Sequence, residues 1–143
     1  MSTFEHIQSR AVSGQGTKFF RETSQIGEIN NIAGPTKSRE TIDVTRLEDD
    51  DGYRRFIASL RDPGTVTMNM NFVRENYDVL NGDYESDDLV EYSIQFPDPD
   101  ETTFTFMAIV TELPVGINIG DKITSDVTLK ISGPVHISAI TSV

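Results

Sequence analysis

The chain has 143 residues and no cysteine, which is enough for one domain and excludes disulfides, thiolate metal sites and thiol nucleophiles. Its 23 acidic and 12 basic residues give a formal net charge of −11, which argues against a broad basic face for nucleic acid and against docking on an anionic membrane. No apolar run approaches the length of a transmembrane helix and the first residues lack the apolar stretch of a signal peptide, so we expect a protein of the cytosol, or one assembled from it, without a membrane anchor.

The N-terminal part predicts an arm followed by three strands. Residues 1–16 are polar and end in Ser13-Gly14-Gln15-Gly16, so we expect a flexible arm leading into a domain over residues 17–143. Residues 18–21 predict a short strand. Isoleucines spaced by three predict an irregular strand that ends at Gly34-Pro35. Apolar and polar residues alternate over 40–45, which predicts a half-buried strand.

Residues 47–64 form the longest predicted loop. Four acids closed by Gly52 open it, and four apolar residues at i, i+3, i+4 and i+7 follow, which allows one or two helical turns over 53–60. Long connections in a compact domain are usually functional or disordered. The mixture of Tyr, Phe and Arg favours a protein–protein contact, because the neighbouring acids would repel a phosphate chain.

The C-terminal part predicts strands around a single helix. Residues 65–73 give the clearest strand, with Met68, Met70 and Phe72 as core. An apolar stripe predicts a helix over about 74–82, ended by Asn81-Gly82. The remaining pattern gives an acidic turn at 83–88, strands at 90–96, 102–113 and 124–132, a hairpin tip at 97–100, a loop at 114–120 and a last short strand over 135–140. Six or seven strands and one short helix predict a mainly β protein, an antiparallel β-sandwich or barrel with one short flanking α-helix.

The sequence shows no catalytic or metal-binding pattern. The acids at 48–51 resemble the start of a calcium loop, but the glycine and the final acid are missing from their required positions. The acids at 83–88 have equally poor spacing. His6 and His136 lie far apart in the sequence, and no nucleophile or phosphate-binding motif is present.

The order of motifs resembles the major tail tube proteins of long-tailed bacteriophages, most closely those of flexible, non-contractile tails. The resemblance covers roughly residues 17–135 and depends on five segments: IDVT (42–45), GTVTMNMNF (64–72), VEYSIQFPD (90–98), FTF (104–106) and DVTLKISG (126–133). One departure is Pro99, where the family often has glycine in the hairpin.

This resemblance implies a structural virion protein that is made in the bacterial host cytoplasm and needs no cofactor, metal or catalytic residue. Six copies would form a ring and rings would stack into a hollow tail tube. The lumen would hold the tape-measure protein and later pass duplex DNA without specific binding, and the two tube ends would meet tail-terminator and tail-tip proteins. A net negative protein suits such a channel, because like charges repel.

The resemblance also implies which segments join the subunits. It gives the N-terminal arm a role in locking subunits together, through Phe4, Ile7 and Arg10. It gives the long loop the contact between rings, through Glu48, Asp49, Asp50, Asp51, Tyr53, Arg54, Arg55, Phe56, Ile57 and Leu60.

Three other hypotheses stay open at this point. A related virion protein, such as a terminator, a distal tail protein or the tube of a contractile tail, would keep the fold and change the neighbours. A small non-viral binding module would be a stable monomer. A hydrolase using acidic residues ranks last, because no pair of carboxylates has an arguable position.

Overall fold

The structure is a computed structural model and describes residues 13–48 and 50–139. These residues form ten strands and one helix. In chain order they are β1 (Lys18–Arg21), β2 (Ser24–Ile26), β3 (Ile29–Ala33), β4 (Ser38–Asp43), β5 (Phe56–Asp62), β6 (Thr65–Asn71), α1 (Arg74–Glu85), β7 (Val90–Gln95), β8 (Thr103–Glu112), β9 (Val115–Gly116) and β10 (Thr124–Ser138).

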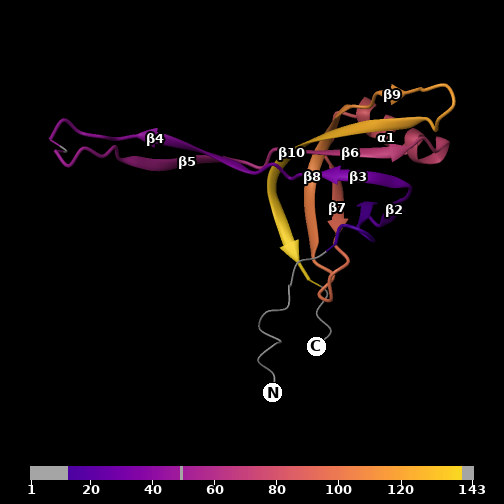
Figure 1. Cartoon of the computed structure of the whole chain (residues 1–143), viewed down its shortest axis with the longest axis horizontal. Coiled ribbons are helices and arrows are strands. Elements are labelled where there is room, and N and C mark those ends of the chain that lie inside the picture. The colour runs from indigo at the N-terminus through magenta and orange to yellow at the C-terminus, as the bar shows by residue number, and fades with distance from the viewer. Residues whose placement is uncertain (1–12, 49, 140–143) are drawn as a thin grey trace, which may run out of the picture.

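Eight strands form one antiparallel sheet in the order β2-β1-β7-β8-β10-β6-β3, with β9 paired to β10. The sheet curls into a half-barrel, and α1 packs against β8. The other two strands, β4 and β5, pair only with each other and form a ribbon that projects far from the sheet (Figure 1). The prediction of a mainly β, antiparallel fold with one short helix is confirmed.

The core lies on one face of the curled sheet. Met68 and Met70 of β6 are buried as predicted, and Leu80 of α1 is buried with them. The rings of Phe19, Tyr92 and Phe106 follow one another across three neighbouring strands, with centroids 5.7 and 6.3 Å apart. Fully burying a side chain of this kind contributes about 1.5–3 kcal/mol. The other buried apolar residues are Ile26, Val66, Ile94, Ala108, Val110, Val127, Leu129 and Ile131.

The segment from 40 to 64 differs most from its prediction. The strand expected at 40–45 exists as β4, but it is exposed along its whole length rather than half-buried, because the ribbon leaves the body of the protein. The loop expected over 47–64 contains strand β5, and the helical turns expected over 53–60 are absent. Both faces of the ribbon are exposed, so its strands need not alternate apolar and polar residues. The spacing of the apolar residues therefore does not indicate the secondary structure here.

Two glycines fix the direction in which the ribbon leaves the sheet. Gly34 and Gly64 have φ of +115° and +82°, and a Cβ on either would collide with the backbone carbonyl of Thr65 or Thr36. The two threonines are joined in turn, since the Thr36 amide donates to the Thr65 carbonyl (3.2 Å) and the Thr65 amide donates to Thr36 Oγ1 (2.9 Å). At the root of the ribbon the two backbone segments therefore pack closely against each other. No residue larger than glycine fits at positions 34 and 64 without moving them.

The helix and the last strand run further than predicted. Asn81-Gly82 does not end α1, which continues to Glu85 and takes Asp83 out of the predicted acidic turn. Gly133-Pro134 does not separate two strands either. Gly133 has φ of +88° and marks a register shift at which β10 bends and then resumes pairing with β8.

The hairpin between β7 and β8 accommodates the unusual Pro99. The Glu101 amide donates to the Asp98 carbonyl (3.0 Å), which closes a tight turn with proline in its second position, where the fixed φ of proline is favourable. Asp98 accepts from both the amide and the hydroxyl of Thr102 (2.8 and 2.6 Å), and these bonds hold the pKa of Asp98 below its usual value.

Candidate assembly surfaces

The ribbon carries an unusual amount of exposed apolar surface. Leu47, Leu60 and Tyr53 are 104, 75 and 70 % exposed, and Phe56 and Ile57 are each 53 % exposed. Large apolar side chains gathered on one projecting element mark an interaction site more often than a stable free surface. The sequence predicted an interface at these residues, and the structure shows that they belong to a strand pair and its turn instead of a loop.

Both faces of the ribbon contribute. Ile57 pairs with Ile42, so these two side chains share one face, whereas Phe56 pairs with Asp43 on the other. The two ribbon strands pack mainly on each other, and at the root Lys130 of β10 lies 3.8 Å from Asp62 of β5. Apolar side chains therefore lie on both faces of the ribbon. This arrangement suits an element that inserts between two partner surfaces.

Polar contacts hold the outer half of the ribbon in shape. The Val44 amide donates to the Arg55 carbonyl (2.8 Å), and Thr45 bonds to both Arg55 and Asp43. The bonds from the Thr45 hydroxyl and amide lower the pKa of Asp43 from its usual value. Asp51 accepts a hydrogen bond from the Arg55 guanidinium and another from the Tyr53 amide (3.0 Å).

All described residues of the predicted ring-stacking site lie on this ribbon, but they do not converge on a pocket. Asp49 lies outside the described residues, as do Phe4, Ile7 and Arg10 of the predicted arm. The described members lie at the tip (Glu48, Asp50, Asp51, Tyr53, Arg54, Arg55) and on β5 (Phe56, Ile57, Leu60).

The two end strands of the large sheet form a second candidate surface. β2 and β3 each pair with only one neighbour among the described residues. An open edge offers unpaired backbone N–H and C=O groups to another strand, and soluble proteins normally block or cover such edges. A half-barrel with an open edge on each side is suited to pairing with further copies of itself.

The exposed face of the sheet is mostly polar, although it also carries Met107 and Ile109. The strand register places Asn69 beside Asp126, Thr67 beside Thr128, and Ser93 beside Thr105. Asn69 Nδ2 donates to Asp126 Oδ1 at 2.7 Å. Over the paired stretches of β1, β7, β8, β10 and β6, this face has two lysines and three acids: Lys18, Lys130, Glu91, Glu112 and Asp126.

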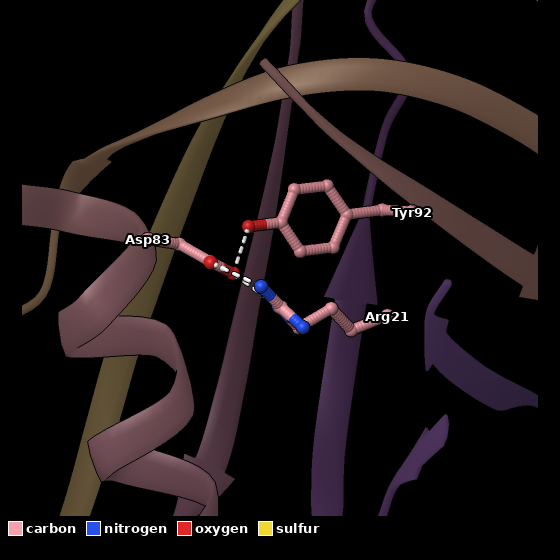
Figure 2. A network of polar contacts seen from close by, with 3 residues as sticks. All are labelled: Arg21, Asp83 and Tyr92. Atoms are coloured by element: carbon pink, nitrogen blue, oxygen red, sulfur yellow. Dashed lines mark hydrogen bonds and ion pairs between the residues drawn. The ribbon is translucent and has the colours of Figure 1, made fainter. Parts of the chain in front are cut away.

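A buried polar network was not predicted from the sequence. Asp83, only 4 % exposed at the end of α1, accepts two hydrogen bonds from the Arg21 guanidinium and one from the Tyr92 hydroxyl, each 2.7 Å long (Figure 2). These bonds raise the pKa of Arg21, and burial raises the pKa of Tyr92 far above its usual value. The network joins α1 to β1 and β7, so its role is to fix the helix on the sheet.

Over 13–48 and 50–139, no group of three or more His, Asp or Glu side chains is placed to hold a metal ion. No helix within these ranges is long and apolar enough to cross a membrane. His136 is exposed on β10, and His6 lies outside the described residues.

Comparison with known proteins points to one family. The sequence model of a family described as lambda phage tail tube protein matches residues 14–138. No curated protein matches the chain in sequence.

Several solved structures contain a chain with a similar fold. One is a chain of the sheath–tube complex of an extracellular contractile injection system in its extended state (TM-score 0.73, 16 % identity, 97 % of this chain and 99 % of that one). A chain of the anti-feeding prophage tube-terminating cap has a TM-score of 0.72 at 11 % identity, covering 92 % of this chain and 93 % of that one. A chain in the tail of an empty gene transfer agent particle with C6 symmetry has a TM-score of 0.68 at 14 % identity, covering 86 % of this chain and 94 % of that one. At these identities the likeness shows a common fold.

Proposed function

The chain belongs to the lambda phage tail tube protein family, and from this membership we propose that six copies form a ring and that rings stack into the hollow tube of a long, non-contractile phage tail. As a member of this family it is a structural protein of a phage-like tail and not an enzyme. The proposal concerns how the copies are arranged.

The observation that carries the proposal is the half-barrel with two open edges. Pairing β2 of one copy with β3 of the next would satisfy both edges and would continue the sheet around a ring. Six-fold closure is supported by the likeness to a tail particle with C6 symmetry. The exposed polar face of the sheet would then line the lumen.

The ribbon supplies the contact between rings in this proposal. It extends beyond the body of its own subunit, and its apolar residues need a partner that the described chain does not provide. We assign to it the contacts predicted for residues 48–60. The lumen would hold the tape-measure protein during assembly, and terminator and tip proteins would close the two ends.

Sedimentation velocity of the purified protein tests self-assembly directly. Raising the protein concentration should convert a slow monomer into particles of at least ring size, because each added copy completes an open sheet edge. A protein that sediments as a monomer at every concentration up to the millimolar range would refute the proposal.

The N-terminal arm should matter for assembly and not for folding. Deleting residues 1–12 leaves the turn in which Thr17 bonds to the Gly14 carbonyl (2.8 and 3.2 Å), so we expect the midpoint of thermal unfolding to change by no more than about 2 °C while assembly weakens. A variant with Phe4, Ile7 and Arg10 replaced by alanine keeps the arm length and should show the same loss. A large fall in the unfolding midpoint would place the arm in the core instead.

Assembled tubes should not retain duplex DNA at physiological salt. The lumen face proposed above carries two lysines and three acids, and a ring of six chains carries a formal charge of 6 × −11 = −66. Tight binding to DNA depends on counterion release by a basic surface. A filter-binding assay at about 150 mM salt should therefore show little retention. Tight retention that weakens steeply with added salt would reveal a basic lumen and contradict this arrangement.

A further inference from the structure

A groove of about 870 Å³ lies where the ribbon joins the body. Its walls come from the start of β4, the end of β5 and the bend of β10. Leu60, Pro63, Pro134 and Val135 supply apolar surface. Leu60 is 75 % exposed at this position, so one wall of the groove is an apolar surface that the described chain leaves uncovered.

The groove is also basic in a strongly acidic protein. Lys37, Arg39 and Arg61 line it, against a single acid, Asp62. Lys130 Nζ lies 3.8 Å from Asp62 Oδ1, so a cation already neighbours that acid. Lys37 lies over the Phe104 ring (5.9 Å) and Arg39 Nε donates to the Ser59 carbonyl (3.4 Å), and neither contact neutralises the positive charge of the groove.

The outer end of the ribbon has the complementary character. The turn at 47–52 contains four acids and no base, and the flanking Arg46, Arg54 and Arg55 leave a net charge of −1 over residues 46–55. Asp51 is bound to Arg55, while Glu48 and Asp50 have no ion pair among the described contacts. Leu47 and Tyr53 flank the acids and are strongly exposed. The acidic turn and the apolar residues beside it thus match the basic and the apolar surfaces of the groove.

We propose that the groove at the root of each ribbon receives the ribbon tip of a second copy of this chain. The proposal rests on the stacking function above and identifies the surface that accepts the ribbon. A chain cannot fill its own groove, because its tip lies at the opposite end of an extended ribbon (Figure 1). From Arg39 to Asp50 the ribbon spans up to about 37 Å at roughly 3.4 Å per residue.

Docking of this kind is head-to-tail. The groove and the tip are different surfaces, so every bound copy presents a new free tip or groove, and the contact repeats without closing. The loop over 117–123 at the other end of the molecule also exposes apolar residues, among them Ile119. That loop contains one acid and one base, Asp121 and Lys122, and offers no net attraction to an acidic tip.

Cysteine cross-linking tests the docking, since the chain has no native cysteine. Leu47→Cys at the tip and Leu60→Cys in the groove, combined in one chain, should give a ladder of covalent multimers on mild oxidation of assembled protein. Each single variant should give little multimer. The matched control combines Leu47→Cys with Ile119→Cys and should give no ladder.

Charge reversal gives an independent test. Arg39→Glu with Arg61→Glu should raise the concentration needed for assembly at least tenfold, and adding Glu48→Lys with Asp50→Lys should restore most of the loss. Three results would overturn the docking but not tube formation. They are tubes without cross-linking between Leu47→Cys and Leu60→Cys, cross-linking between Leu47→Cys and Ile119→Cys, and no recovery of assembly when Glu48→Lys and Asp50→Lys are added. Absence of any large particle in the unmodified protein would overturn both.

Discussion

We expect that replacing Tyr53, Phe56 and Ile57 by serine strongly impairs tube growth and leaves a folded protein. All three side chains are at least half exposed on the ribbon, and the sheet core does not depend on them. Losing their burial at each contact between rings should cost about 3 kcal/mol, which corresponds to a rise of roughly a hundredfold in the concentration needed for growth. Sedimentation of wild-type and variant protein at matched concentrations measures the effect.

A conservative variant separates loss of contact from loss of the ribbon. Tyr53→Phe, Phe56→Tyr and Ile57→Val together keep most of the apolar surface and should assemble within a few-fold of the wild-type concentration. Circular dichroism of both variants should match the wild type, because β4 and β5 stay joined by backbone hydrogen bonds. Tubes of normal length from the serine variant would show that the ribbon does not join the rings.

Replacing Asp83 by alanine should cause the largest loss of folding stability among single polar substitutions. The change leaves the Tyr92 hydroxyl buried without its acceptor and removes the partner of Arg21. Breaking a buried, hydrogen-bonded charge pair typically costs about 3 kcal/mol or more. The Arg21 side chain is 29 % exposed, so water can solvate it after the substitution, and we expect a loss at the low end of this range. The free energy of unfolding should fall by about 3 kcal/mol, which lowers the unfolding midpoint by roughly 10 °C.

A second acid on the same helix provides the control. Asp78 forms an exposed ion pair with Arg74, and such pairs contribute at most about 1 kcal/mol. The free energy of unfolding of Asp78→Ala should therefore be close to that of the wild type. Tyr92→Phe removes one hydrogen bond, and its free energy of unfolding should fall by about 1 kcal/mol. Equal unfolding free energies for Asp83→Ala and Asp78→Ala in urea titration would mean that the network does not stabilise the fold.

The sequence predicted the body of the fold because its core strands have one buried face. In β6 and β10 the apolar residues alternate strictly, so Met68, Met70 and Val127 could be assigned to the core from period alone. The ribbon could not be assigned in this way. Neither of its faces is buried in the subunit, so the spacing of Tyr53, Phe56 and the residues after them fitted a helix by chance.

The buried network escaped prediction for a different reason. Asp83 stands beside other acids after Asn81-Gly82, a pattern typical of a helix stop and a solvated turn. Its partner Arg21 lies 62 residues away in the sequence, and Tyr92 lies nine residues away on the strand that follows the helix. Tertiary contacts of this kind stabilise the last turn of α1, which continues to Glu85. Such contacts cannot be predicted from the helix propensity of the local sequence. The sequence predicted an interface that includes the acidic segment at 47–52, but the basic groove proposed as its counterpart could be found only from the three-dimensional structure of the ribbon root.

Electron microscopy of the concentrated protein tests the central claim most directly. We expect hollow tubes of uniform diameter whose end-on averages show six subunits around an open channel, with the curled sheets continuous from one copy to the next through β2 and β3. Particles that remain single subunits, or filaments without a central channel and six-fold symmetry, would contradict the proposed arrangement.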